Sequence, residues 1–184
     1  MRVRNLSCVG VGIGSAVAIG RQTLVTNAHV VQGAIEIQVN TWTGRTFDTR
    51  VAAAAFLDDL AVVRTVAALP AVARLGTDPA PGDTVRIAGF PYGGRLRLVE
   101  GRVTDDQPGD RYGQRGRVMR IDATIAPGNS GGPVFNAAGE LVGVAFGADR
   151  VTGHALAIPV SSLRSIESRA DLRAVPGDCS DLED

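Results

Sequence analysis

The chain has 184 residues, 45% of them hydrophobic, so it can bury one large core or two smaller cores that share an interface. Lys plus Arg and Asp plus Glu each number 19, and the resulting formal net charge of zero disfavours nucleic acid and anionic membranes as partners. The apolar runs are broken by glycine and shorter than the roughly 20 residues of a membrane-spanning helix. We expect no nucleic-acid partner and no membrane contact by this chain itself, and leave open whether a membrane anchor is missing from it.

Short apolar, β-branched stretches alternate with glycine, proline, asparagine and aspartate, which is typical of an all-β fold. We predict one domain of two six-stranded antiparallel β-barrels with a C-terminal helix. The first barrel, at about 8–68, is assigned strands 12–19, 23–26, 35–39, 47–53 and 60–65. A crossing segment at about 69–82 leads to the second barrel, at about 83–160, with strands 84–88, 95–104, 118–122, 133–135, 141–146 and 154–158.

Two segments between and after these strands carry different patterns. The polar, Gly- and Pro-rich stretch 105–116 predicts a long exposed loop. Ser161, followed by Leu163, Ile166 and Ala170 at helical spacing, predicts a capped amphipathic helix that packs on the second barrel. This helix and a tail occupy residues 161–184.

The two cysteines, Cys8 and Cys179, lie near opposite ends of the chain. Neither has a CxxC partner or a nearby His pair, so we expect no metal site. A bridge between them would close a long loop, contribute up to about 5 kcal/mol in the chain-entropy model, and imply an oxidising compartment. The alternative is two unrelated buried thiols.

The glycines of Gly10-Val-Gly-Ile-Gly14 match part of a dinucleotide-binding loop. Such a loop must open a helix, whereas the residues that follow Gly14 continue as a strand. We therefore expect no cofactor.

Three short segments could together support nucleophilic catalysis by a serine. Such a hydroxyl needs a base, a group that orients the base, and donors for the oxyanion. Ser130 lies in Gly-Asn-Ser-Gly-Gly at 128–132, whose glycines can form a positive-φ turn that aims backbone N–H groups at one point. His29 closely follows a predicted strand, and Asp59 opens another. Taken singly, each segment also has a structural explanation: a glycine-rich loop, a surface histidine and a solvated turn.

In combination, the chain order His, Asp, Ser resembles that of the chymotrypsin-clan serine proteases, and bacterial HtrA/Deg proteases are the nearest large group. The segments that match the HtrA pattern are Thr-Asn-Ala-His-Val at 26–30, Asp-Leu-Ala-Val at 59–62, and 122–133, which ends in Gly-Asn-Ser-Gly-Gly-Pro. The resemblance spans almost the whole chain and implies a serine endopeptidase acting on polypeptides through an acyl-enzyme.

The same resemblance assigns catalytic roles to individual residues. It implies Ser130 as the nucleophile and His29 as the general base, with the N–H groups of Gly128 and Ser130 binding the oxyanion. It implies Asp59, rather than Asp58, as the carboxylate that orients the base, because Asp59 directly precedes Leu-Ala-Val.

The resemblance also implies a specificity pocket. In the family, the residue five before the serine and the strand after the serine line this pocket, which here gives Ile125, Ala145, Phe146 and Gly147, with His154 on the far wall. These small or apolar residues predict cleavage after small or medium apolar side chains. If His154 reaches the pocket, its protonation below about pH 6.5 would favour an acidic residue before the cleaved bond. The alternative is that His154 is a surface histidine.

Asn129 occupies the position where trypsin-like zymogens carry the Asp that binds a newly released N-terminal ammonium. Activation through that salt bridge is therefore excluded. The oxyanion turn must instead be ordered by a neighbouring loop, by the disulfide or by substrate.

The Gly-Val-Ala-Phe-Gly-Ala run at 143–148 and the terminal cysteines resemble the periplasmic protease domains of mycobacterial MarP-type acid-resistance proteases. This resemblance implies an extracytoplasmic, stress-related domain with a Cys8–Cys179 disulfide. No PDZ-like domain follows, so we expect a monomer. Two alternatives stay open: a non-catalytic peptide-binding scaffold on the same fold, and a protease switched by the Cys8–Cys179 bridge.

Overall fold

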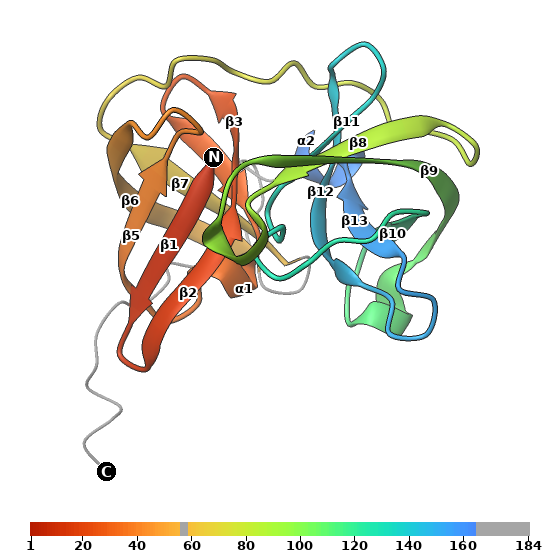
Figure 1. The fold of residues 1–184 in the computed structure, drawn as a ribbon, viewed down its shortest axis with the longest axis horizontal. Helices are drawn as coiled ribbons and strands as arrows, with labels where there is room; N and C mark the ends of the chain where they lie inside the picture. Colours follow the sequence, from red (N-terminus) through yellow and green to blue (C-terminus); the bar gives the residue numbers. More distant parts are fainter. Residues whose placement is uncertain (56–58, 165–184) are drawn as a thin grey trace.

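The computed structural model describes residues 1–55 and 59–164 as two β-rich lobes that lie side by side (Figure 1). The N-terminal lobe is a seven-stranded sheet in the order β2-β1-β5-β6-β7-β4-β3. Its strands are β1 (Arg2–Ser7), β2 (Gly10–Ser15), β3 (Val17–Gly20), β4 (Thr23–Thr26), β5 (Ala34–Asn40), β6 (Thr46–Ala55) and β7 (Leu60–Thr65).

The C-terminal lobe is a closed barrel in the order β10-β13-β12-β11-β8-β9. Its strands are β8 (Thr84–Gly89), β9 (Arg97–Pro108), β10 (Arg117–Ile121), β11 (Pro133–Phe135), β12 (Leu141–Ala148) and β13 (Ala155–Pro159). The short helices are α1 (Ala28–Val31), α2 (Val160–Arg164) and the 3₁₀ turns η2 (Pro91–Gly93) and η3 (Gly109–Tyr112). The predicted all-β double-lobe architecture and the six strands of the second barrel are confirmed.

The N-terminal sheet curls into a half-barrel instead of closing as six strands. The predicted strand 12–19 is two strands, because the chain changes partners at Ala16: β2 pairs with β1, and β3 pairs with β4. Since β2 and β3 are the two edges of the sheet, the edges are joined covalently at Ala16 and the sheet must curl.

Strand β1 was not predicted from the sequence. In it the fully buried Val3 and the nearly buried Asn5 alternate with Arg2 and Arg4. A single apolar residue among polar ones carries too weak a period-two pattern to indicate a half-buried strand.

A third apolar cluster joins the two lobes. It contains Val17, Val25, Leu60, Val62, Leu141, Val144, Ile158, Val160 and Leu163. On β7, Leu60 and Val62 belong to this cluster while Ala61 and Val63 belong to the core of the first lobe. Successive side chains of a strand point to opposite faces, so both faces of β7 are buried and its sequence is almost continuously apolar.

The predicted exposed loop at 105–116 is wrong in its first part, because β9 continues to Pro108, and the remaining connection to β10 begins with η3. The aspartates that made this stretch resemble a loop are paired across the β9–β10 ladder. Asp105 binds Arg120 and Asp106 binds Arg117, both at 2.6 Å. Cross-strand ion pairs let charged residues occupy a strand.

Helix α2 begins at Val160, and the backbone N–H of Ser161 donates to the Asp78 carboxylate at 2.9 Å. Its buried Leu163 packs in the cluster between the lobes. Residues 165–184 lie outside the described residues, and with them the rest of the predicted helix and the Cys179 half of the predicted disulfide. Within residues 1–55 and 59–164, no helix has the length and hydropathy needed to span a bilayer.

Truncation of Leu141 to alanine should destabilise the protein because Leu141 is fully buried between the lobes. The expected loss is about 2–5 kcal/mol of unfolding free energy, measured by urea denaturation. Leu98→Ala is the matched control, since Leu98 is 64% exposed on β9 and should change the stability by less than about 0.5 kcal/mol. Equal losses in the two variants would contradict the assigned packing.

Candidate active site

His29 lies on α1, a single helical turn that follows β4 where the two lobes meet (Figure 1). The start of this turn is fastened to the Asp59 carbonyl, which accepts hydrogen bonds from the Asn27 side-chain amide (2.9 Å) and the Ala28 backbone N–H (3.1 Å). These bonds join the segment of His29 to the start of β7. The position of the histidine is therefore fixed by the same residue that approaches its ring.

The end of α1 is held by β1. The side-chain amide of the buried Asn5 donates to the carbonyls of Val30 and Gln32, both at 3.0 Å. An α-helix leaves its last carbonyls without backbone partners, and a side-chain donor satisfies them here. Asn5 is thus a positioning residue that sequence reasoning missed, because β1 itself was not predicted.

The carboxylate of Asp59 binds His29 twice. It accepts from ring Nδ1 at 2.7 Å and from the His29 backbone N–H at 2.9 Å. Asp59 is buried (8% exposed) and has a φ of 47°, in the left-handed region that aspartate tolerates better than most residues. Because a carboxylate can only accept, the hydrogen of the neutral ring belongs on Nδ1, and Nε2 keeps a free lone pair.

Ser130 lies in a turn that only glycine-rich sequence can form. Gly128 and Gly131 have φ values of 98° and 82°. A Cβ at Gly131 would come within 2.0 Å of the Ser15 carbonyl oxygen, and one at Gly128 within 2.4 Å of the Phe90 carbonyl oxygen. Both positions therefore require glycine for conformation and for space.

Two hydrogen bonds set the direction of the peptide planes in this turn. The Pro127 carbonyl accepts from the Tyr92 N–H at 2.7 Å, and the Asn129 carbonyl accepts from the Gly132 N–H at 2.8 Å. In a trans peptide the N–H points opposite to the carbonyl, so the N–H groups of Gly128 and Ser130 face away from these partners. Neither N–H donates to an acceptor within the described residues.

The fully buried Ser15, at the end of β2, is the centre of the contacts that hold the turn. Its N–H donates to the Ser130 carbonyl (2.7 Å) and its Oγ to the Gly128 carbonyl (2.8 Å). Its Oγ also accepts from the Phe90 N–H (3.1 Å), and its carbonyl accepts from the Thr26 hydroxyl (2.6 Å). Ser15 connects four segments of the chain.

The adjoining Gly14 shows how close the segments of His29 and Ser130 lie. A Cβ on Gly14 would come within 2.5 Å of Val30 Cγ1 and within 3.1 Å of the Ser130 carbonyl oxygen. The backbone of Gly14 is therefore sandwiched between α1 and the serine turn. The structure brings together His29, Asp59 and the turn that contains Gly128 and Ser130.

The hydroxyl of Ser130 donates to the Phe146 carbonyl at 3.2 Å. Within the described residues, it makes no hydrogen bond to His29. Because the hydroxyl has one hydrogen to donate, it must leave the Phe146 carbonyl before it can donate to Nε2.

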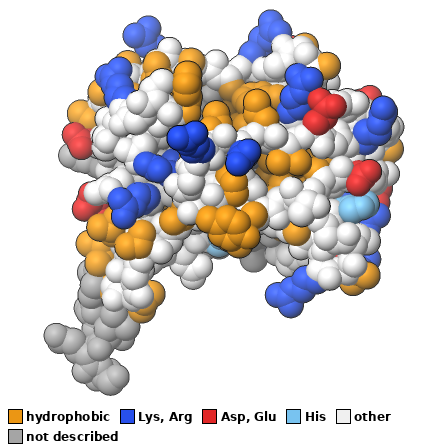
Figure 2. All heavy atoms as spheres, viewed as in Figure 1, with side chains coloured by type: hydrophobic (Ala, Val, Ile, Leu, Met, Phe, Trp, Pro, Cys, Tyr) orange, Lys and Arg blue, Asp and Glu red, His pale blue; other side chains and the backbone are white. Residues whose placement is uncertain are grey.

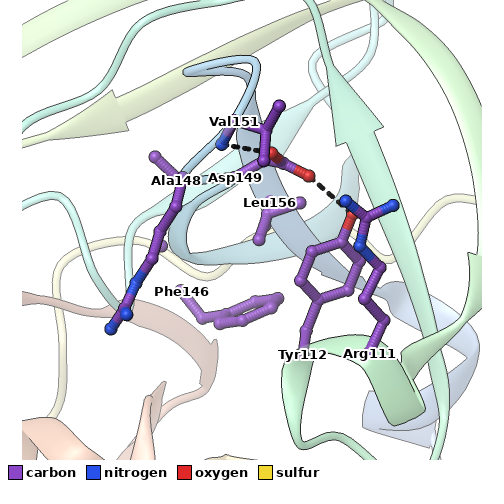
Figure 3. A pocket seen from close by; sticks show the side chains of 9 residues that line it. Arg111, Tyr112, Phe146, Ala148, Asp149, Val151 and Leu156 are labelled. Atoms are coloured by element: carbon purple, nitrogen blue, oxygen red, sulfur yellow. Dashed lines mark hydrogen bonds between the residues drawn. The ribbon is translucent and has the colours of Figure 1, made fainter.

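A cavity of about 520 Å³ opens beside Phe146 (Figure 3). We call it the Phe146 cavity. It is lined by Arg111, Tyr112, Phe146, Gly147, Ala148, Asp149, Arg150, Val151 and Leu156. Its walls come from η3, from the end of β12 and the loop that follows it, and from β13.

Of the residues predicted to line a specificity pocket, Phe146 and Gly147 line this cavity. Ala145 is fully buried in the core of the second barrel, and Ile125 packs against that core. His154 precedes β13, with Nε2 3.7 Å from an oxygen of Asp122. Sequence reasoning missed the other walls, because η3 and the β12–β13 loop meet only in the folded barrel.

The buried carboxylate of Asp149 fastens the walls of the cavity to each other. It accepts from the backbone N–H groups of Val151 (2.8 Å) and Thr152 (3.0 Å) and from the Tyr112 hydroxyl (2.8 Å), as Figure 3 shows for Val151 and Tyr112. The bonds from Thr152 and Val151, and then that from Tyr112, hold the pKa of Asp149 well below its usual range. Burial, and then the bond to Asp149, raise the pKa of Tyr112.

Comparison with known proteins gives consistent matches. A model of the trypsin-like peptidase domain matches residues 14–144. The putative serine protease HhoA of Synechocystis sp. is 38% identical over 169 residues, which cover 85% of this chain and 42% of HhoA. The serine protease Do-like HtrA of Bacillus subtilis is 33% identical over 172 residues, covering 84% of this chain and 38% of that protein. The chain thus spans about two fifths of the length of these relatives.

Solved structures agree with these matches. The HtrA-type protease AlgW with tripeptide superposes with a TM-score of 0.84 at 27% identity, covering 91% of this chain and 58% of that one. The Rv3671c protease from M. tuberculosis, active form, superposes with a TM-score of 0.82 at 26% identity, covering 97% of this chain and 84% of that one. The predicted HtrA-like and MarP-like resemblance is confirmed.

Replacement of Asp149 by asparagine should destabilise the protein in a pH-dependent way. A carboxyl whose pKa is lowered by folding stabilises the fold above its unfolded pKa of about 3.9, and this stabilisation is lost as the pH falls through the folded pKa. Asp149→Asn should therefore lower the melting temperature at pH 7, and the difference from wild type should shrink below about pH 4. Asp110→Asn, on the neighbouring turn η3, is the control. A difference that stays constant from pH 7 to pH 3 would contradict the assigned role of the carboxylate.

Proposed function

We propose that this chain, which belongs to the trypsin-like peptidase domain family, hydrolyses polypeptides through an acyl-enzyme formed on Ser130. The chain is a serine protease domain of HtrA type. The observation that carries the proposed mechanism is the pair formed by His29 Nδ1 and the buried Asp59 carboxylate, which leaves Nε2 free to act as a base beside the turn of Ser130.

The first chemical step follows from these groups. Ser130 Oγ rotates from the Phe146 carbonyl toward His29 Nε2 and loses its proton to Nε2 as Oγ attacks the substrate carbonyl. The Asp59 carboxylate keeps the ring in the required tautomer and stabilises the imidazolium that forms. The N–H groups of Gly128 and Ser130, which donate to no acceptor in the part of the chain that the structure describes, bind the developing oxyanion.

The remaining steps use the same residues, with His29 acting first as a general acid and then again as a general base. The imidazolium of His29 returns the proton to the leaving amine, the carbon–nitrogen bond breaks, and the acyl group stays on Ser130. His29 then removes a proton from a water molecule, whose oxygen attacks the ester carbonyl. The bond between the acyl carbon and Ser130 Oγ breaks, the His29 imidazolium returns its proton to Oγ, and the new carboxyl end is released. Preorganised backbone donors lower the barrier of both halves of the reaction without reorganising.

The substrate of the proposed reaction is a polypeptide with a small or medium apolar residue before the cleaved bond. The ring of Phe146 and the side chains of Leu156 and Val151 in the adjoining cavity are compatible with apolar substrate side chains. We place the domain outside the cytoplasm, in a stress-related role. Relatives such as the probable periplasmic serine endoprotease DegP-like of Halomonas elongata support this setting.

The proposed extracytoplasmic setting includes a disulfide between Cys8 and Cys179. Cys8 directly follows β1, the strand whose Asn5 supports the helix of His29. A covalent tie at this point would restrain the strand on which α1 depends.

Active-site labelling with a fluorophosphonate tests the catalytic assignment. Wild type should be labelled covalently, and Ser130→Ala should not be labelled and should lose about 10⁶-fold in kcat. Asp59→Asn should lose about 10⁴-fold because the ring would adopt the wrong tautomer. Asp58→Asn is the matched control and should keep near wild-type activity. Labelling that persists in Ser130→Ala, or a larger loss from Asp58→Asn than from Asp59→Asn, would overturn the assignment.

Intact-mass analysis tests the disulfide. Protein alkylated without reductant should keep its native mass, whereas reduction before alkylation should add two alkyl groups. Cys8→Ser should cost about 2–5 kcal/mol of unfolding free energy because the unfolded chain loses its cross-link. Alkylation of both cysteines in the untreated protein would refute the bridge. A difference in protease activity between samples with and without reductant would favour a redox-switched protease.

A further inference from the structure

A second concave surface lies away from the Phe146 cavity, between the β5–β6 turn and the segment after β8. Two cavities of about 520 and 330 Å³ meet there and share Thr41, Trp42, Thr43, Phe90 and Leu96. We call these two adjoining cavities, taken together, the Trp42 groove. It has no lining residue in common with the Phe146 cavity.

The Trp42 groove presents large apolar side chains to solvent. Trp42, the single tryptophan of the chain, is 75% exposed, and Leu96 on the facing wall is 39% exposed. Scattered exposed apolar residues are common, but exposed apolar side chains that line a groove mark an interaction surface. Tryptophan and arginine are among the residue types most enriched at the hot spots of protein interfaces.

The charge of the groove is of one sign. Arg2 and Arg95 line it, and neither cavity has an Asp or Glu among its lining residues. Arg2 is held in place by a hydrogen bond from Nη1 to the Gly93 carbonyl at 3.0 Å. Figure 2 shows basic side chains gathered near the middle of the viewed face, with hydrophobic surface adjoining them.

We propose that the Trp42 groove docks an extended polypeptide segment of another protein, in which a bulky apolar residue is flanked by carboxylates. The apolar side chain packs against Trp42 and Leu96, and the carboxylates pair with Arg2 and Arg95. The absence of lining carboxylates selects against basic segments, since like charges brought together in an interface repel.

The groove shares a wall with the serine turn. Phe90 lines the groove, and its N–H donates to Ser15 Oγ while its carbonyl packs against Gly128. Two residues on, the N–H of Tyr92 orients the Pro127 peptide. A docked segment therefore lies against Phe90, a residue that also supports the turn of Ser130, although docking itself requires no catalysis.

The tryptophan fluorescence of the chain measures binding at the groove, because Trp42 is the single tryptophan. The intact chain is titrated with a short peptide that carries one Phe between Asp and Glu residues. Its emission should shift to the blue and saturate as Trp42 leaves water. The same peptide with Asn and Gln in place of Asp and Glu should bind about tenfold more weakly. Failure of every acidic peptide to shift the emission would overturn the proposal.

Two variants test the charged wall. Arg95→Gln should weaken binding about threefold, the size expected of one exposed charge pair. Arg21→Gln makes the same charge change at an exposed residue outside the groove and should leave binding unchanged. Far-UV circular dichroism verifies that both variants fold. Equal weakening by the two variants would show nonspecific charge attraction and contradict a built site.

Other occupants of the groove would give distinct outcomes. If a second copy of this chain occupied the groove, sedimentation would show a dimer for wild type and a monomer for Leu96→Asn. That result would refute the docking of a segment from another protein. An oligonucleotide that shifts Trp42 emission as well as the acidic peptide would likewise refute it. Because binding is read from fluorescence, Ser130→Ala should bind the peptide as wild type does, so loss of the proposed catalysis leaves this test intact.

Discussion

The arrangement of the candidate site depends on one buried hydrogen-bonding residue, Ser15. Its backbone and hydroxyl join the end of β2 to Thr26, Phe90, Gly128 and the carbonyl of Ser130. Buried polar groups are costly when unpaired, so a fully satisfied serine at this position favours a single geometry. Because β2 belongs to the first lobe and the serine turn to the second, these bonds fix the two lobes relative to each other beside the segments that carry His29 and Ser130.

The same bonds account for the order of the serine turn in a chain with Asn129 before the proposed nucleophile. The sequence excluded a trypsin-style ammonium bond and left a neighbouring loop, the disulfide or substrate as alternatives. In the structure the neighbouring loop supplies the contacts: Tyr92 orients the Pro127 peptide, and Asn129 is buried with its side-chain amide against Gly89. In the free protein, these contacts therefore hold the N–H groups of Gly128 and Ser130 pointing away from Tyr92 and Gly132.

Much of the fold could be predicted because most strands carry apolar, β-branched residues between turn residues. The exceptions have physical causes. Polar β1 is stabilised by pairing on both sides, and the aspartates of β9 are neutralised by cross-strand arginines. The motif residues of the site could be recognised from short stretches of sequence. The distant residues that hold them in place by hydrogen bonds could not. The bond from Ser15 to Gly128 joins residues 113 positions apart, and that from Tyr112 to Asp149 joins residues 37 apart. No local pattern encodes such contacts.

We propose that the backbone of the serine turn is set for an oxyanion before substrate arrives. A crystal structure of the protein phosphonylated on Ser130 tests this proposal most directly, in comparison with a crystal of the free protein. We expect one phosphonyl oxygen to accept from the N–H groups of both Gly128 and Ser130, with the bonds from Tyr92 to Pro127 and from Ser15 to Gly128 unchanged between the two crystals. A Pro127–Gly128 peptide that is flipped in the free protein, or an adduct oxygen that reaches neither N–H group, would contradict it.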